Sequence, residues 1–201
     1  MKIIGIVGTN SAKSTNRQLL TFMQSHFANK AEIELVEIKG LPVFNKPEDK
    51  VLPDYVKELS DKIEAADGVI ISTPEYDHAV PASLMNVLAW LSYGIYPLVD
   101  KPVMITGASY GTLGSSRAQG HLRQILDSPD IRARVMPASE FLLGHSLQAF
   151  DGNNNLVDQE KLDVLDGLFD DFLLFIDITK QLLNAKDAVR KEAENFSWEA
   201  E

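Results

Sequence analysis

The sequence predicts an α/β protein, a three-layer α/β/α sandwich around a five-stranded parallel sheet. Short apolar, β-branched runs alternate along the chain with longer amphipathic stretches, in the order βαβαβαβαβα. Several of the short runs are apolar on both faces, as in strands that helices cover on both sides. The length of 201 residues suits one such domain, because strands joined by helical crossovers form a parallel sheet with right-handed connections.

The residue pattern in the first part of the chain predicts three strands and two helices. Lys2–Gly8 is β-branched, apolar on both faces and too short for a helix, which favours a buried strand. Thr15–Phe27 has its apolar residues on one helical stripe, and Glu32–Ile38 alternates acidic and apolar residues, as in a strand near a sheet edge. After a loop with three prolines, Asp54–Ala65 is predicted to be a helix and Asp67–Thr73 a buried strand.

The middle of the chain repeats this alternation twice. Ala82–Ser92 is apolar nearly all round and is predicted to be a helix, and Pro102–Ala108 is a second buried strand. Leu113–Leu126 is predicted to be a helix, and Ala133–Ala138 the fifth strand. Five strands and five helices match the flavodoxin-like order, whereas the six-stranded dinucleotide-binding fold needs a longer chain.

The last part of the chain contains a turn and a long helix. Leu147–Asn155 carries Asp-Gly and three consecutive asparagines, which indicates a turn or short hairpin. Gln159–Asn184 is predicted to be a long amphipathic helix. We therefore expect one domain over residues 1–184, followed by a charged tail at 185–201.

Composition narrows the function classes. The formal net charge is −10, and residues 151–201 hold 13 acidic and only 5 basic residues, so nucleic acid is not expected as a partner. The acidic segment suits a solvated helix face, or a specific cationic partner. The absence of cysteine excludes disulfides, thiolate metal sites and cysteine nucleophiles, and is compatible with the cytoplasm. No apolar run suggests a signal peptide or a membrane span.

Three polar loops follow the strands at the edge where open α/β sheets bind ligands. The first, residues 8–17, joins a buried strand to a helix and has six small polar or amide side chains. It contains neither the dinucleotide-binding fingerprint GxGxxG nor the phosphate loop GxxxxGK[ST]. A helix N-terminus with such donors favours a phosphomonoester, while the simpler alternative is that Ser14 or Thr15 only caps the helix.

The second loop, Thr73–Pro81, is stiffened by prolines and places an aromatic residue between two acids. A rigid loop of this kind suits a flat heteroaromatic ligand. Glu75 and Asp77 also suggest acid–base chemistry or a metal, but no second cluster follows at ligand spacing, so no metal site is predicted. His78 by itself is more typical of a surface histidine than of a catalyst.

The third loop, Gly107–Ser115, follows the fourth strand and contains three glycines. Glycine lets the backbone approach a ligand closely and accept positive φ. By itself the loop is also explained as a glycine-rich turn before a helix. Three such loops on one sheet edge indicate a binding site.

Three motifs resemble the NAD(P)H-dependent FMN reductases, including the related azoreductases and quinone reductases. GTNSAKSTNRQLL resembles the phosphate loop of that family, and PEYDHAVPASLMNVLAWLS resembles its P-E-Y-N signature segment. DKPVMITGASYGTLGSSRAQGHLRQIL resembles the stretch S-x-G-x-x-G-x-x-R-A with its preceding strand. The resemblance covers about residues 1–182 and implies a flavodoxin-like fold with bound FMN.

The resemblance also implies roles for particular residues. The phosphate would be held by residues of the first loop, one side of the isoalloxazine by the second, and the other side by the third. These implied FMN-binding residues are Asn10, Ser11, Ser14, Thr15, Asn16, Pro74, Glu75, Tyr76, Asp77, Gly107, Ser109, Tyr110 and Gly111.

Some positions depart from the family pattern. The arginine usual in the phosphate loop is replaced around Ala12 and Lys13, so a guanidinium contact is lost. Asp77 and His78 stand where an asparagine and a small residue are usual, and a carboxylate near the ring would oppose a negative charge on reduced flavin.

The implied activity is hydride transfer from NAD(P)H through FMN to a flat acceptor, such as free flavin, a quinone, an azo compound or a nitro compound. The mechanism expected is ping-pong, with no obligatory catalytic side chain, because the flavin supplies the redox chemistry. Arg117, His121 and Arg123 could contact an NADPH phosphate or be ordinary surface cations. The alternatives from other classes are a flavodoxin-type electron carrier and a redox-responsive partner module.

A homodimer is also expected, and a tetramer is less certain because Met85 and Ala89 replace two charged residues that often pair across family subunits. The segment Ala82–Tyr96 has more large apolar residues than one helix face needs, which suggests a surface shared between subunits. These residues are Leu84, Met85, Val87, Leu88, Trp90, Leu91, Tyr93, Ile95 and Tyr96.

Overall fold

A computed structural model describes residues 1–137 and 140–183, and it confirms the predicted α/β fold. All strand pairs in the sheet are parallel, and the strand order is β2-β1-β3-β4-β5, with β6 also paired to β4. The strands are β1 (Lys2–Val7), β2 (Glu32–Glu37), β3 (Gly68–Ser72), β4 (Pro102–Ala108), β5 (Arg134–Val135) and β6 (Phe141–Leu143).

The predicted fifth strand is divided into two short strands along the same edge of β4. Pro102 pairs with Arg134 in β5, and Thr106 pairs with Phe141 in β6. The first piece ends with the Met136 N–H, which donates to the Val103 carbonyl at 2.8 Å. A single strand over Ala133–Ala138 was therefore a wrong expectation, although its last residue lies outside the described part.

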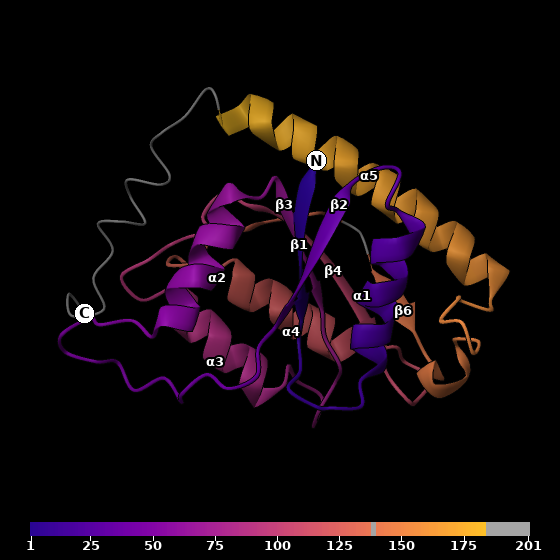
Figure 1. Cartoon of the computed structure of the whole chain (residues 1–201), viewed down its shortest axis with the longest axis horizontal. Helices are drawn as coiled ribbons and strands as arrows, with labels where there is room; N and C mark the ends of the chain where they lie inside the picture. The colour runs from indigo at the N-terminus through magenta and orange to yellow at the C-terminus, as the bar shows by residue number, and fades with distance from the viewer. Residues whose placement is uncertain (138–139, 184–201) are drawn as a thin grey trace.

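Helices cover both faces of the sheet (Figure 1). One apolar core joins the sheet to α2, α3 and α4, and the other joins it to α1 and α5. Asp67 links β1 to α5, because its carboxylate accepts the Lys2 N–H at 2.7 Å and pairs with the Lys180 ammonium at 2.7 Å. The helices are α1 (Thr15–His26), α2 (Asp54–Ala65), α3 (Ala82–Leu91), α4 (Ser116–Leu126) and α5 (Gln159–Leu183), with a 3₁₀ turn η1 at Ser146–Gln148.

Two element boundaries matter for the site. Helix α4 begins at Ser116 rather than at Leu113, because Gly114 and Ser115 have φ of 57° and 69°, outside the helical region. The predicted turn before α5 is present, with Phe150 bridged to Leu156. The predicted tail, 185–201, lies outside the described residues.

The apolar residues of α3 are used within the chain, which corrects the argument for a shared surface. Six of the nine, Leu84, Val87, Leu88, Trp90, Leu91 and Tyr93, are buried. The loop after β2 covers the helix: the Trp90 indole donates to the Pro42 carbonyl at 2.9 Å, and the Phe44 ring lies 5.0 Å from that of Trp90. Only Met85 among the nine is strongly exposed, at 38%. The apolar count of this helix therefore does not require a second subunit.

Candidate functional site

The three predicted loops surround one cavity of about 520 Å³ at the carboxyl ends of β1, β3 and β4. This is the edge at which parallel sheets bind ligands. The sequence missed five of its lining residues, Thr9, Lys13, Ala108, Thr112 and Leu113. The predicted residues that line it are Ser11, Ser14, Thr15, Asn16, Pro74, Glu75, Tyr76, Ser109, Tyr110 and Gly111.

One end of the cavity is polar and lies at the N-terminus of α1. Ser14 is the N-cap, and its hydroxyl accepts a hydrogen bond from the Arg17 N–H at 3.2 Å. Ser11 and Lys13 line the same end. The first turn of α1 contains no acidic residue, so the free N–H groups and the Lys13 ammonium give this end a positive potential. Helix capping and phosphate binding, the two roles expected of this loop, are therefore compatible: Ser14 caps the helix, and the loop remains suited to a phosphate.

Arg17 supports this loop from the outside. Its guanidinium donates to the carbonyls of Ser11 at 3.0 Å and Ala12 at 3.2 Å, and also pairs with the Glu37 carboxylate. The hydrogen bond to Glu37 raises the pKa of Arg17 above its ordinary value. Arg17 thus fixes the path of the loop, while Lys13 is the cation that lines the cavity.

Asn16 connects α1 to two strands. Its amide nitrogen donates to the Ala108 carbonyl at 2.9 Å, and its oxygen accepts from the Ala108 N–H and the Ser72 hydroxyl, each at 2.9 Å. The neighbouring Thr15 hydroxyl pairs with that of Ser146 at 2.8 Å. Both Thr15 and Asn16 are buried. Their side chains therefore hold the loops around the cavity in place.

Glu75 caps α4 across the cavity wall. Its carboxylate accepts from the backbone N–H groups of Arg117 at 2.9 Å and Ala118 at 3.2 Å, and it pairs with the Arg117 guanidinium at 3.3 Å. The N-cap residue of α4, Ser115, makes no side-chain cap hydrogen bond. A carboxylate from another loop therefore satisfies the first turn of α4, which is a structural role rather than an acid–base role.

The other two basic residues of α4 are also engaged in local contacts. The Arg123 guanidinium donates to the Met136 carbonyl at 3.0 Å, and His121 lies 3.5 Å from the Val80 N–H. Neither residue lines the cavity.

The opposite end of the cavity is apolar and aromatic. Tyr76, Tyr110 and Leu113 line it and are exposed by 48%, 59% and 48%. The Tyr76 hydroxyl lies 3.3 Å from that of Thr9, so the first and second loops meet at the cavity wall. A methyl group added at Gly111 would contact nothing within 4 Å, which leaves the wall open at that point. The arrangement suits a ligand with an anion at one end and a flat ring at the other.

Three of the predicted residues do not line the cavity: Asn10, Asp77 and Gly107. Gly107 lies behind the wall, where a Cβ atom would be 2.7 Å from the Thr73 carbonyl. Asp77 and His78 form the tip of a two-residue turn with φ of 49° and 64°. Tyr76 and Ala79 close this turn by exchanging backbone hydrogen bonds of 3.1 and 2.9 Å, as in a type I′ hairpin.

This turn yields a stability prediction. Replacement of His78 by glycine should raise the free energy of unfolding by about 1 kcal/mol, because glycine adopts positive φ without the steric cost of a Cβ atom. His78→Ala is the matched control, since it removes the same imidazole but keeps the Cβ atom. Urea unfolding of the three proteins measures the effect. Equal stability of the glycine and alanine variants would contradict it.

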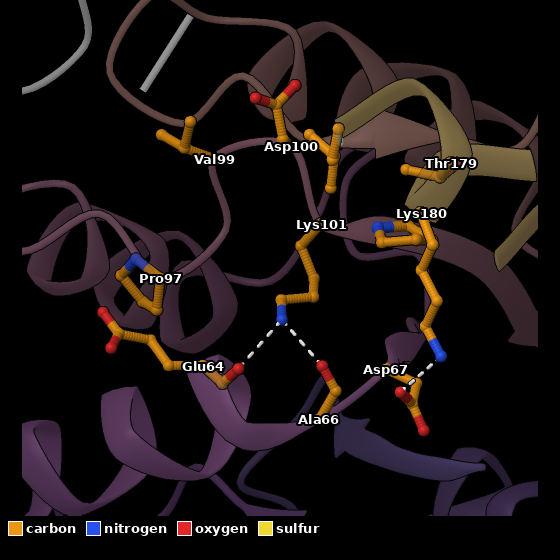
Figure 2. Close-up of a pocket in the computed structure, with 11 residues that line it drawn as sticks. Glu64, Ala66, Asp67, Pro97, Val99, Asp100, Lys101, Thr179 and Lys180 are labelled. Carbon is orange, nitrogen blue, oxygen red and sulfur yellow. Dashed lines mark hydrogen bonds and ion pairs between the residues drawn. The ribbon is translucent and has the colours of Figure 1, made fainter. Parts of the chain in front are cut away.

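A second cavity, of about 300 Å³, lies at the opposite edge of the sheet (Figure 2). Its two lysines are engaged in local contacts. The Lys101 ammonium donates to the carbonyls of Glu64 at 3.2 Å and Ala66 at 2.7 Å, and Lys180 pairs with Asp67 at 2.7 Å. Although burial opposes ionisation of Asp67, the hydrogen bonds from Lys180 and the Lys2 N–H lower its pKa. These contacts explain the cavity as a junction of α2, β3, β4 and α5.

Within residues 1–137 and 140–183, none of the helices has the length and apolar composition of a membrane span. No group of three His, Asp or Glu side chains there lies close enough to hold a metal ion.

Known proteins resemble this chain over most of its length. The family model for NADPH-dependent FMN reductases matches residues 1–148. The NADH:(hydroxy)cinnamate reductase subunit CrdA of Vibrio ruber is 54% identical over 99% of this chain and 98% of that protein. The NADH-dependent flavin reductase subunit 2 of Lactobacillus johnsonii is 44% identical, over 88% of this chain and 98% of that protein.

Among solved structures, the flavoenzyme NAD(P)H:(acceptor) oxidoreductase FerB of Paracoccus denitrificans superposes with a TM-score of 0.78. It is 26% identical and covers 89% of this chain and 98% of its own. The family match confirms the oxidoreductase class and the FMN and NAD(P)H cofactors predicted from the three motifs. The chain therefore belongs to the NADPH-dependent FMN reductase family.

Proposed function

We propose that the protein binds FMN in the 520 Å³ cavity and passes hydride from NAD(P)H to a flat acceptor by a ping-pong mechanism. Free flavins, quinones, azo compounds and nitro compounds are the acceptors that fit. The observation that carries the proposal is the polarity of the cavity, which has an anion-binding helix end and an aromatic end. Bound FMN supplies the hydride-transfer chemistry.

The residues present fit this cofactor. Ser11, Lys13 and Ser14, with the first N–H groups of α1, would hold the phosphate. Tyr76 and Tyr110 would contact the ring from two loops, and the open backbone at Gly111 leaves room beside it. Arg17, Asn16 and Glu75 would act indirectly, by holding these loops at their observed positions. No side chain in this set is assigned to proton transfer.

The alternative of a flavodoxin-type carrier receives less support from the cavity rim. Carriers that dock on protein partners typically surround the flavin with acidic residues, whereas none of the exposed lining residues here is acidic: they are Lys13, Tyr76, Tyr110, Gly111, Thr112 and Leu113. A rim without exposed acidic residues favours small flat acceptors. Steady-state oxidation of NADH with a quinone separates the two functions, because an enzyme gives parallel double-reciprocal lines and a carrier gives no turnover.

We further propose that the working form contains more than one chain. The Vibrio ruber and Lactobacillus johnsonii relatives are both named as subunits, which supports an assembly. A homodimer, the sequence-based prediction, is the simplest form, and light scattering distinguishes it from a monomer, a tetramer and a complex with a different chain. The cytoplasmic location also stays a prediction.

Cofactor selectivity tests the site. FMN should bind the cofactor-free protein at least about 100-fold more tightly than riboflavin, because charge-assisted hydrogen bonds to a phosphate contribute about 1.5–3 kcal/mol each. FMN should also bind more tightly than FAD, whose second phosphate and adenosine extend beyond the cavity. Fluorescence titration with the three flavins measures this. Equal affinity for FMN and riboflavin would contradict the assignment of the polar end.

A further inference from the structure

A separate cavity of about 490 Å³ adjoins the proposed FMN cavity and shares two wall residues with it, Thr112 and Leu113. It lies between the start of α4, strand β6, the turn η1 and the first turn of α5. None of the predicted site residues lines it. Its position beside the proposed flavin makes it accessible to a ligand that already touches the ring.

The wall between the two cavities is fixed by close backbone packing. A Cβ atom at Gly144 would be 2.5 Å from the Thr112 carbonyl oxygen, and one at Gly114 would be 2.6 Å from the Leu142 carbonyl carbon. The backbone N–H of His145 also donates to the Gly111 carbonyl at 2.9 Å. The 490 Å³ cavity beside the proposed FMN site is therefore formed before any ligand binds, as small-molecule sites usually are.

The lining combines an apolar surface with two basic side chains. Leu113 and Val157 are large apolar residues exposed by 48% and 58%. Lys161 and His145 line the same cavity, and their side chains make no hydrogen bond or ion pair within the part of the chain described. The Asp158 carboxylate is directed to the helix itself, since it accepts the backbone N–H of Lys161 at 3.1 Å.

An uncompensated ammonium is unusual in this part of the chain. Residues 151–201 carry 13 acidic and 5 basic residues, and Lys180, the other lysine described there, is paired with Asp67. A cation beside an apolar wall suits a ligand with one anionic group on a flat or apolar body.

We propose that this cavity is the second substrate subsite, in which Lys161 holds the anionic group of a molecule whose flat part reaches the flavin. The proposal rests on the proposed function. Two sources share this chemistry: the adenosine phosphate end of NAD(P)H, and the carboxylate of an aromatic-acid acceptor. Because the two substrates react in separate half-reactions of a ping-pong mechanism, kcat/KM for each substrate depends on its own half-reaction alone, so a changed KM at unchanged kcat identifies the substrate affected.

The test compares Lys161→Gln with the wild type in the FMN-loaded protein. Loss of the ammonium should raise one KM about 3- to 10-fold, the range expected for a partly exposed charge contact of about 1 kcal/mol, while the dissociation constant of FMN stays unchanged. A higher KM for NADH identifies the nucleotide. A higher KM for 4-nitrobenzoate, with that for nitrobenzene unchanged, identifies the acid acceptor. Lys57→Gln, an equal charge change on α2, should alter neither.

A second variant and a binding measurement check the same contact independently. Val157→Asp places a carboxylate in the cavity and should raise the same KM as Lys161→Gln. Calorimetric titration of the FMN-loaded protein with 5′-AMP and with 4-nitrobenzoate should show binding of one of them, weakened by Lys161→Gln. An active wild type whose KM values and calorimetric affinities are unaffected by Lys161→Gln would overturn the subsite alone. A wild type that neither binds FMN nor oxidises NADH would instead overturn the proposed function.

Discussion

Replacement of Asn16 by alanine should lower the free energy of unfolding by about 3–5 kcal/mol, because three buried hydrogen bonds are lost together. The amide of Asn16 pairs with both backbone groups of Ala108 and with the Ser72 hydroxyl, each at 2.9 Å. Alanine would leave the Ala108 N–H and carbonyl without their observed partner in a buried position. Urea unfolding of the cofactor-free protein, followed by circular dichroism, measures the loss.

Asn10 provides the matched control. It lies in the same loop, is exposed and makes no side-chain hydrogen bond in the described part of the chain. Asn10→Ala should change stability by less than about 0.5 kcal/mol, as is usual for surface positions. If Asn16→Ala were as stable as Asn10→Ala, the Asn16 contacts would not support the loops, and a direct phosphate contact would become the better explanation of that residue.

Replacement of Gly107 by alanine should destabilise the protein by about 3 kcal/mol, at the upper end of the usual cost of overpacking. The added methyl group would meet the Ser115 hydroxyl, lie 2.7 Å from the Thr73 carbonyl and lie 2.9 Å from the Gln119 amide. The Thr73 carbonyl belongs to the backbone beside β4, so it cannot move without shifting β3. Thermal and urea unfolding of the variant both measure this cost.

Gly111→Ala separates packing from binding, since its methyl group would contact nothing within 4 Å. This variant should keep the wild-type stability and instead weaken FMN binding, because Gly111 lines the cavity. Wild-type stability of Gly107→Ala would show that α4 can move away from β4, and that the glycine is not required for their close approach.

The sequence predicted the fold well where local pattern and tertiary packing agree. Helix α2 and strand β4 have the bounds that were expected, and three polar loops surround one cavity. Periodicity did not reveal β6, because three residues are too few to show a pattern and its pairing with β4 is set by tertiary contacts.

The contacts of each side chain in the site were harder to predict than which residues line the cavity. The family resemblance implied that Asn16 and Glu75 contact FMN, and both line the cavity. The structure adds contacts that the resemblance did not indicate: Asn16 binds Ala108, and Glu75 binds the first turn of α4. Such partners are distant in the sequence, so no local motif identifies them. Lys13 had a detectable signal, a cation inside a loop expected to hold phosphate, although it was considered only as the site of a missing arginine.

The cap that Glu75 provides couples the cavity wall to the first turn of α4. Its carboxylate holds the amide hydrogens of Arg117 and Ala118, while its own loop lines the cavity. Any ligand that displaces the loop must also release these two amides, and any ligand that steadies the loop must protect them. Hydrogen exchange at Arg117 and Ala118 therefore reports the state of the cavity from a helix that the ligand need not touch.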